Sequence, residues 1–341
     1  MSIEKHLIKK VSLEKLFDVI LQQGKTIYAP RTNKGKINYD FVSVFSEITT
    51  DYIQTTQSAK AVAFPRTEKL FRYTKEKQGL TLKDFDPQQV PETVLWGVRP
   101  CDAAGFIPLT TIFNWDSKDN LYNTRLDKTT IIAFSCHTAD KSCFCTSVGG
   151  NPGDTKGSDI LITQLGDSGQ YLAEILTEKG QKIVDFAPAL FEIAPEVEKE
   201  NYLAKLPIQF NREDIKDKLE AFFESDLWLN QSLRCLGCGA CAYVCPTCAC
   251  FDIQDESHGK EGARVRCWDS CGLSLFTLHT SGHNPRNVQS QRWRQRLLHK
   301  FSYMPDRLAV YGCTGCGRCS RACPADMNIL EHLLSIQEIK K

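Results

Sequence analysis

The last third of the chain carries two runs of four cysteines with the same spacing. Each run places three thiols at every third position, a fourth thiol four residues later, and a proline directly after it. The first run consists of Cys235, Cys238, Cys241 and Cys245, and the second of Cys313, Cys316, Cys319 and Cys323. This spacing suits thiolate ligands of [4Fe–4S] clusters, because a tight loop can wrap three corners of one cube. The duplicated run therefore predicts two such clusters.

In two-cluster ferredoxins with this spacing, the fourth cysteine of each run ligates the cluster of the other run. The expected ligand sets are Cys235, Cys238, Cys241 with Cys323, and Cys313, Cys316, Cys319 with Cys245. Paired CxxC units can also bind zinc, but a zinc site has no use for three evenly spaced cysteines, a fourth and a proline, twice. A disulfide framework is disfavoured because a chain of 341 residues can build a core without one.

Four further cysteines follow two short apolar runs in the first half of the chain. They are Cys101, Cys136, Cys143 and Cys145. The apolar runs, 94–98 and 130–134, predict buried strands, and ligand sites in open α/β sheets gather at the carboxyl ends of strands. The four thiols therefore predict a third [4Fe–4S] cluster, with His137 as a possible substitute ligand. Unligated buried thiols and a thiolate zinc site remain the alternatives.

Residues 246–312 form a long insert between the two runs. The insert carries Cys248, Cys250, Cys267 and Cys271 and a basic aromatic stretch, 292–303. Of these thiols, Cys248, Cys250 and Cys271 are extra ligand candidates for a fourth cluster, although packing beside the other clusters is favoured. The basic stretch is expected to be a solvated helix face with Trp293 and Leu297 packed inward, or else a docking surface for an acidic partner.

Composition is that of an ordinary globular protein, with 42% hydrophobic and 24% charged residues and a net charge of +1. The balanced charge and the lack of a recognisable nucleic-acid motif argue against nucleic-acid binding. No apolar run approaches the roughly 20 residues that span a bilayer, and no signal peptide is apparent. We therefore expect a cytoplasmic protein without membrane insertion.

The front portion of the chain predicts a mixed α/β domain. An amphipathic helix is expected over 13–22, with Gly24 as its stop. Buried strands are expected at 61–64, 94–98, 130–134, 159–163 and 171–176. A charged helix is expected over 212–230, and a last helix after Pro324. The predicted organisation is an α/β domain (1–211) carrying the third cluster, a connector helix (212–230) and a ferredoxin-like two-cluster domain (231–341).

Several motifs besides the cysteine runs are more specific. They are Arg99-Pro100-Cys101-Asp102, Cys143-Phe144-Cys145, Cys245-Pro246-Thr247-Cys248-x-Cys250, Trp268-x-Ser270-Cys271 and Gly282-His283-Asn284-Pro285-Arg286. With these motifs the chain resembles the iron–sulfur β subunit of cytoplasmic sulfhydrogenases and the closely similar A subunit of anaerobic sulfite reductase. The segment from Ala61 to Phe71 also matches this pattern, so the resemblance spans most of the chain.

The resemblance implies an electron-transfer subunit that is not catalytic on its own. It implies a flavin- and NAD(P)H-binding reductase subunit as one partner. The other partner would be a terminal catalytic subunit, a [NiFe] hydrogenase or, as the alternative, an anaerobic sulfite reductase. The chain has no Gly-x-Gly-x-x-Gly fingerprint after a strand, so we expect it to bind neither flavin nor nicotinamide itself.

Two other classes of function compete with this interpretation. An iron–sulfur redox sensor would need a DNA- or protein-binding module, and no helix-turn-helix pattern is apparent. A self-contained oxidoreductase would use Cys101 or Cys136 as nucleophile and would need His137 as base. On a strand, however, His137 would point away from its neighbour Cys136.

Overall fold

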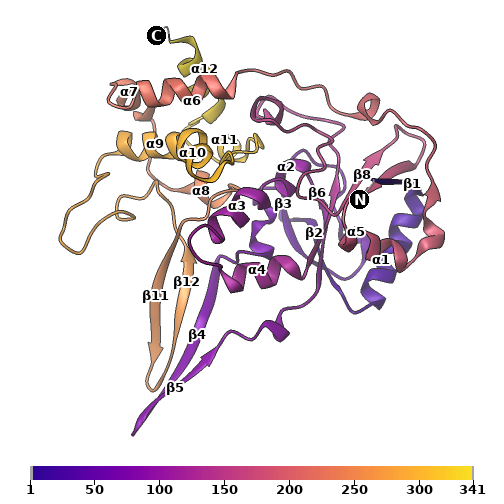
Figure 1. Ribbon diagram of the computed structural model, residues 1–341, viewed down its shortest axis with the longest axis horizontal. Helices are drawn as coiled ribbons and strands as arrows, with labels where there is room; N and C mark the ends of the chain where they lie inside the picture. The colour runs from indigo at the N-terminus through magenta and orange to yellow at the C-terminus, as the bar shows by residue number, and fades with distance from the viewer. Residues whose placement is uncertain (1–2, 340–341) are drawn as a thin grey trace.

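The computed structural model describes residues 3–339 and has an eight-stranded mixed sheet at its centre (Figure 1). The strands of this sheet are β1 (Glu4–Lys9), β2 (Thr26–Asn33), β3 (Lys36–Val42), β6 (Thr93–Val98), β7 (Thr129–Phe134), β8 (Ile160–Gln164), β9 (Gln170–Ile175) and β10 (Glu192–Ile193). Their order is β10-β1-β9-β8-β7-β6-β2-β3. The four strands β2, β6, β7 and β8 run parallel, and the outer pairs are antiparallel.

Alternate side chains of the central strands enter two separate cores. On β6, Val94 and Trp96 face one core, whereas Leu95 and Val98 face the other, because a bulge at Gly97 shifts the alternation. Helices α1 (Lys10–Gln22) and α5 (Glu178–Asp185) contribute to the first core, and α2 (Pro100–Ala103), α3 (Phe106–Phe113) and α4 (Asn120–Asp127) to the second. Burial on both faces explains why these strands are continuous apolar runs in the sequence.

A second sheet forms an arm that projects from the body (Figure 1). Its strands are β4 (Thr67–Glu76), β5 (Gly79–Asp84), β11 (Phe251–His258) and β12 (Glu261–Trp268), in the antiparallel order β11-β12-β4-β5. At its base, Arg266 pairs with Glu68 and Asp119. Trp268 donates its indole N–H to the carbonyl of Phe64 at 3.1 Å. The insert between the cysteine runs is therefore built into the N-terminal part of the molecule.

The C-terminal part is mostly helical and surrounds a third core. Its elements are α6 (Arg212–Ala221), α7 (Leu227–Ser232), α8 (Ala240–Tyr243), α9 (Gln289–Leu298), a π-helical turn (His299–Tyr303), α10 (Met304–Leu308), α11 (Arg318–Arg321) and α12 (Ile329–Glu338). Short 3-10 turns elsewhere are Phe45–Glu47, Ala59–Val62, Pro87–Gln89, Cys145–Val148, Pro188–Leu190 and Lys199–Tyr202. Phe144 and Phe210 from the preceding segments enter the third core beside Phe301.

Most of the predicted elements are confirmed, and two are wrong. The helix over 13–22, the strands within 94–98, 130–134, 159–163 and 171–176, and the last helix are all present. The run 61–64 is not a strand, because Ala59–Val62 forms a 3-10 turn that buries Lys60 and Phe64. The helix over 212–230 is broken after Ala221, where the Trp228 indole donates to the Phe222 carbonyl at 2.8 Å and the chain turns.

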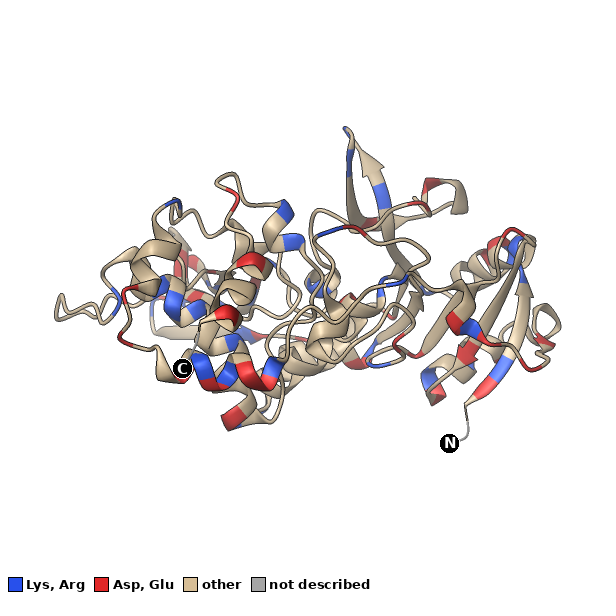
Figure 2. Cartoon of the chain, turned by 90° about the horizontal axis from the view of Figure 1, so that it is seen from above, with Lys and Arg blue, Asp and Glu red and all other residues tan. Residues whose placement is uncertain are grey.

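Charge is distributed evenly over the molecule. Figure 2 shows Lys and Arg interspersed with Asp and Glu along its whole length. Across residues 3–339, no helix combines the length and apolar character needed to cross a membrane.

His332 on α12 makes stability depend on pH. Its ring packs edge-on against Trp293 at 4.9 Å between centroids, and burial, helped by the charge of Arg234, lowers the pKa of His332 to about 4. In the unfolded chain a histidine has a pKa of about 6.5. As the pH falls, His332 is therefore protonated in the unfolded state first. The contribution of the neutral ring to the free energy of unfolding is complete above about pH 6.5 and is lost as the pH falls toward 4. Because the His332 ring is only partly buried, solvent screens part of this effect. Between pH 7 and 5, wild type should therefore lose about 1 kcal/mol more unfolding free energy than His332→Phe. Denaturant titrations at both pH values measure the difference, and equal losses would contradict it.

Candidate iron–sulfur centres

Four thiols from the N-terminal part line one cavity. This N-terminal thiol group consists of Cys101, Cys136, Cys143 and Cys145. Cys101 lies in α2 directly after β6, and Cys136 follows β7. Because β6 and β7 are neighbouring parallel strands, their carboxyl ends meet at one edge of the sheet. The structure thus brings together the four thiols that the sequence grouped.

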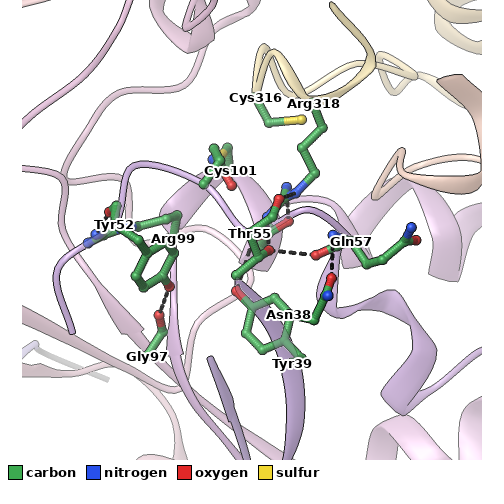
Figure 3. A network of polar contacts seen from close by, with 12 residues as sticks. Asn38, Tyr39, Tyr52, Thr55, Gln57, Gly97, Arg99, Cys101, Cys316 and Arg318 are labelled. Atoms are coloured by element: carbon green, nitrogen blue, oxygen red, sulfur yellow. Dashed lines mark hydrogen bonds and ion pairs between the residues drawn. The ribbon is translucent and has the colours of Figure 1, made fainter. Parts of the chain in front are cut away.

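Burial raises the pKa of Cys101, Cys136 and Cys145. The pKa of Cys101 lies well above its usual range, that of Cys145 rises to about 12, and that of Cys136 rises to about 11 although Arg99 opposes the shift. Thiols bind metal as thiolates, so binding here would displace protons. Arg99 is only 4% exposed and lies 4.2 Å from the Tyr52 ring (Figure 3). It supplies positive charge beside the group.

His137 lies outside this cavity. Its side chain is exposed, and the cavity is lined instead by the following residues Thr138 and Ala139. The geometry therefore gives no support to His137 as a substitute ligand or as a catalytic base.

A second cavity is lined by the thiols predicted for the first cluster. This first-run group consists of Cys235, Cys238, Cys241 and Cys323, and Cys319 lines the same cavity. The amide of Gln289 donates to the Cys235 sulfur at 3.0 Å, and the backbone N–H of Met327 donates to the Cys323 sulfur at 3.2 Å. Cys238 is exposed. This group therefore has one side open to solvent.

The thiols predicted for the second cluster are also neighbours. This second-run group consists of Cys313, Cys316, Cys319 and Cys245, whose charges act on one another. Burial raises the pKa of Cys313 to about 12 and that of Cys316 to about 11. The pKa of Cys245 instead lies well below the usual range, although the residue is buried. A hydrogen bond from the Cys248 thiol and the positive charge of Lys300 both lower it.

The repeat in sequence is also a repeat in backbone conformation. Gly237 and Gly315 both have φ +66°, in the left-handed region that favours glycine. Two residues later, Gly239 and Gly317 have φ 72° and 69° and precede the single-turn helices α8 and α11. Each run therefore turns twice in the same way.

The second run packs directly against the N-terminal thiol group. The N–H of Phe144 donates to the Gly315 carbonyl at 2.9 Å. A Cβ atom on Gly315 would lie 2.5 Å from the Cys145 nitrogen, and one on Gly317 would collide with the Ser142 carbonyl. The absence of these side chains lets the two backbones touch.

A buried ion pair lies behind this contact. Arg318 donates to both carboxylate oxygens of Asp102, one of them at 2.6 Å, and also to the backbone and hydroxyl of Thr55 (Figure 3). The Arg318 and Asp102 side chains are 1% and 0% exposed. Tyr39 donates a further hydrogen bond to Asp102 at 3.2 Å. The pair joins the second run to the residue that follows Cys101.

The remaining insert thiols pack against one another. Cys248 is hydrogen-bonded to Cys245, and Cys250 is hydrogen-bonded to Cys271. These pairwise contacts favour packing, rather than ligation of a fourth cluster, for Cys248, Cys250 and Cys271. Cys267 lies apart on β12 and is partly buried.

The basic stretch 292–303 is not the solvated face that its sequence suggested. Trp293 and Leu297 are buried as expected, but Arg292, Arg296 and Lys300 are buried as well, at 9%, 4% and 4% exposure. Helical periodicity assigns long cationic side chains to solvent, whereas here they reach sulfur and carbonyl atoms. One signal was available, since no Asp or Glu occurs from 270 to 305 to pair with these cations.

The donor sets fit cubanes better than single metal ions. All sixteen cysteines are free thiols. Within residues 3–339, no three His, Cys, Asp or Glu side chains converge closely enough to hold one metal ion. Tetrahedral zinc requires thiolates roughly 3.8 Å apart, given Zn–S bonds of about 2.3 Å. A cubane presents its irons at separate corners and accepts thiolates spaced around a cavity, which is the arrangement of the N-terminal and first-run groups.

Comparison with known proteins agrees with this chemistry. Residues 234–327 match the family described as a 4Fe–4S dicluster domain, which makes the chain an iron–sulfur protein of the electron-transfer class. The chain is 29% identical over 329 residues, covering 94% of both chains, to subunit beta of sulfhydrogenase 2 from Pyrococcus furiosus. It is therefore a homologue of the sulfhydrogenase beta subunit. No solved structure matches the chain.

Proposed function

We propose that the chain is the electron-transfer subunit of a multisubunit oxidoreductase and that it holds three [4Fe–4S] clusters in a row. The observation that carries this proposal is the central position of the second-run group. Its Cys316 lines the N-terminal cavity, and its Cys319 lines the cavity of the first-run group. A group that touches both of the others is the middle member of three.

The proposed ligands are the members of the three thiol groups. Cys323 completes the first-run group and Cys245 completes the second-run group, as in ferredoxins. The proposed division of the chain is an α/β domain (1–211), a connector (212–230) and a ferredoxin-like domain (231–341) whose insert (246–312) contributes two strands to the arm.

A [4Fe–4S] cluster, when bound, supplies a one-electron redox couple. The protein holds the ligand sulfurs and stabilises their charge. Side-chain amides of Gln54 and Gln289 donate to Cys101 and Cys235, at 2.9 and 3.0 Å. Such donors raise the reduction potential of the group that the sulfurs bind. Because Cys238 of the first-run group is exposed, whereas the four thiols of the N-terminal group are only partly exposed, the open end of the row is the first-run end.

We propose two kinds of partner. One is a flavin- and NAD(P)H-binding reductase subunit, and the other is a [NiFe] hydrogenase catalytic subunit. The relative's description as a sulfhydrogenase subunit supports hydrogenase over the alternative, an anaerobic sulfite reductase. Affinity purification of the tagged chain under anaerobic conditions identifies the terminal subunit.

Iron content tests the proposal most directly. We expect about 12 Fe and equivalent acid-labile sulfide per chain in anaerobically purified protein. About 8 Fe would refute the N-terminal cluster and leave only the ferredoxin-like pair. Iron near zero with stoichiometric zinc would refute electron transfer altogether. Cys136→Ala should lose about 4 Fe, whereas the matched control Cys267→Ala, outside all three groups, should keep the full amount.

A further inference from the structure

Three cationic side chains are buried beside the second-run group. They come from distant segments: Lys60 from the 3-10 turn Ala59–Val62, Arg296 from α9 and Lys300 from the π-helical turn. Their exposed fractions are only 3%, 4% and 4%. Folding therefore brings three positive charges into one buried region.

Lys300 makes the closest approach to a proposed ligand. Its Nζ atom lies 3.4 Å from the Cys245 sulfur, 3.0 Å from the Thr247 hydroxyl and 2.6 Å from the Gly312 carbonyl. Thr247 in turn lies 3.1 Å from the same sulfur and donates to the same carbonyl at 2.6 Å. This closed set of contacts fixes the ammonium group next to the ligand sulfur.

Arg296 and Lys60 surround the neighbouring backbone. Arg296 donates to the Cys241 carbonyl at 3.0 Å and lies 3.7 Å from the Cys248 sulfur. Lys60 donates to the Cys248 carbonyl at 2.8 Å and lies 4.0 Å from the centre of a Trp268 ring. The acceptors of all three cations are thus carbonyl, hydroxyl and sulfur atoms rather than carboxylates.

Two other buried cations of this chain are paired with carboxylates instead. Arg318 is paired with Asp102, and Arg266 with Glu68. A buried cation without an anion nearby is strongly unfavourable, so the cations near Cys245 require negative charge from another source. The Cys245 sulfur lies 3.4 Å from the Lys300 ammonium, and the other two contacts of that ammonium are neutral oxygens. The negative charge that Lys300 faces is therefore that of a sulfur ligand.

We propose that Lys300, assisted by Arg296 and Lys60, is a positioning residue that raises the reduction potential of the cluster held by the second-run group. The proposal rests on the proposed function, because it needs a cluster at that group. Reduction adds one electron, and hence one negative charge, to a site where the Coulomb interaction with a buried cation is strong. The central member of the row therefore holds an electron more tightly than its thiolates alone would allow.

Redox titration of Lys300→Met tests this inference. Anaerobic protein is titrated with dithionite as the one-electron donor while EPR follows each cluster, after iron and sulfide have been counted. In the variant, we expect one midpoint to become more negative by at least a tenfold change in the one-electron equilibrium, which is about 59 mV. The other midpoints should move less. Lys300→Arg, which keeps the charge, should restore the wild-type value.

Lys179→Met is the matched control. Lys179 also donates to two backbone carbonyls, those of Leu126 and Thr129, but at the opposite end of β7 from Cys136. The midpoint potentials of all clusters in this variant should equal those of wild type. If Lys300→Met does not retain iron, Lys60→Met is titrated instead, with a smaller negative shift of the same midpoint expected. An iron-loaded variant with wild-type potentials overturns the inference, whereas a low iron count in wild type overturns the proposed function instead.

Discussion

Gly315→Ala is expected to lower the free energy of unfolding by about 3–5 kcal/mol. Two effects add together. The residue has φ +66°, which strains any residue with a Cβ atom, and that atom would lie 2.5 Å from the Cys145 nitrogen. The colliding atoms belong to backbone, which cannot rotate away as a flexible side chain would. Denaturant unfolding of the anaerobic protein measures the loss.

Gly282→Ala is the control for this prediction. Gly282 also has a positive φ, +82°, but a Cβ atom there would meet nothing within 4 Å. Only the conformational cost of about 1 kcal/mol should remain. Because the Gly315 contact supports Cys145, we also expect Gly315→Ala to lose iron from the N-terminal group while Gly282→Ala keeps it. Equal losses of stability in the two variants would show that the backbone contact is not tight.

Asp102→Asn is expected to cost about 3–5 kcal/mol of unfolding free energy, the loss typical of breaking a buried ion pair from one side. The change keeps the shape of the side chain but removes its charge, which leaves Arg318 buried without an anion. The amide oxygen can still accept a hydrogen bond, but the amide nitrogen cannot replace the second carboxylate oxygen as an acceptor, so the loss includes both charge and hydrogen bonding. Thermal or denaturant unfolding of iron-loaded protein gives the value.

Asp255→Asn is the matched surface control. Asp255 also accepts two hydrogen bonds from one arginine, Arg264 on the neighbouring strand. Those two side chains are 52% and 45% exposed, so water screens the pair and its loss should cost much less than the loss of the Asp102 pair. An Asp102→Asn protein as stable as Asp255→Asn would mean that water reaches Arg318.

Local patterns in the sequence predicted the parts of the fold that depend on local burial. The strands β6, β7 and β8 are buried along almost their whole length because both faces of the sheet are covered, and each therefore contains a short apolar run. The arm strands could not be found in this way. Strands β5 and β11 are exposed throughout, and β12 depends on its pairing with β4, a partner far away in the sequence. Pairing between distant segments leaves no periodic signal in either one.

In the candidate site, too, the features set by local sequence were predicted and those set by distant contacts were not. The spacing of the cysteines predicted which thiols would gather, because each run folds as a local turn fixed by glycine. It did not predict that the second run would lie in the middle, since that depends on the contact between Gly315 and Phe144. The buried cations were also missed. Nothing near Lys60 in the sequence indicates that its partner is the Cys248 carbonyl.

The pairing of β4 with β12 also constrains how the chain folds during synthesis. Until residues 261–268 have been made, β4 has a partner only on the β5 side, and its other edge presents unpaired N–H and C=O groups. Translation of residues 77–260 takes roughly 10–40 s at about 5–20 residues per second. Throughout that interval Phe64 also lacks Trp268, against which it packs. The N-terminal half of this protein therefore emerges from the ribosome before it can fold completely. Its folding is completed only after the carboxyl-terminal third has been synthesised.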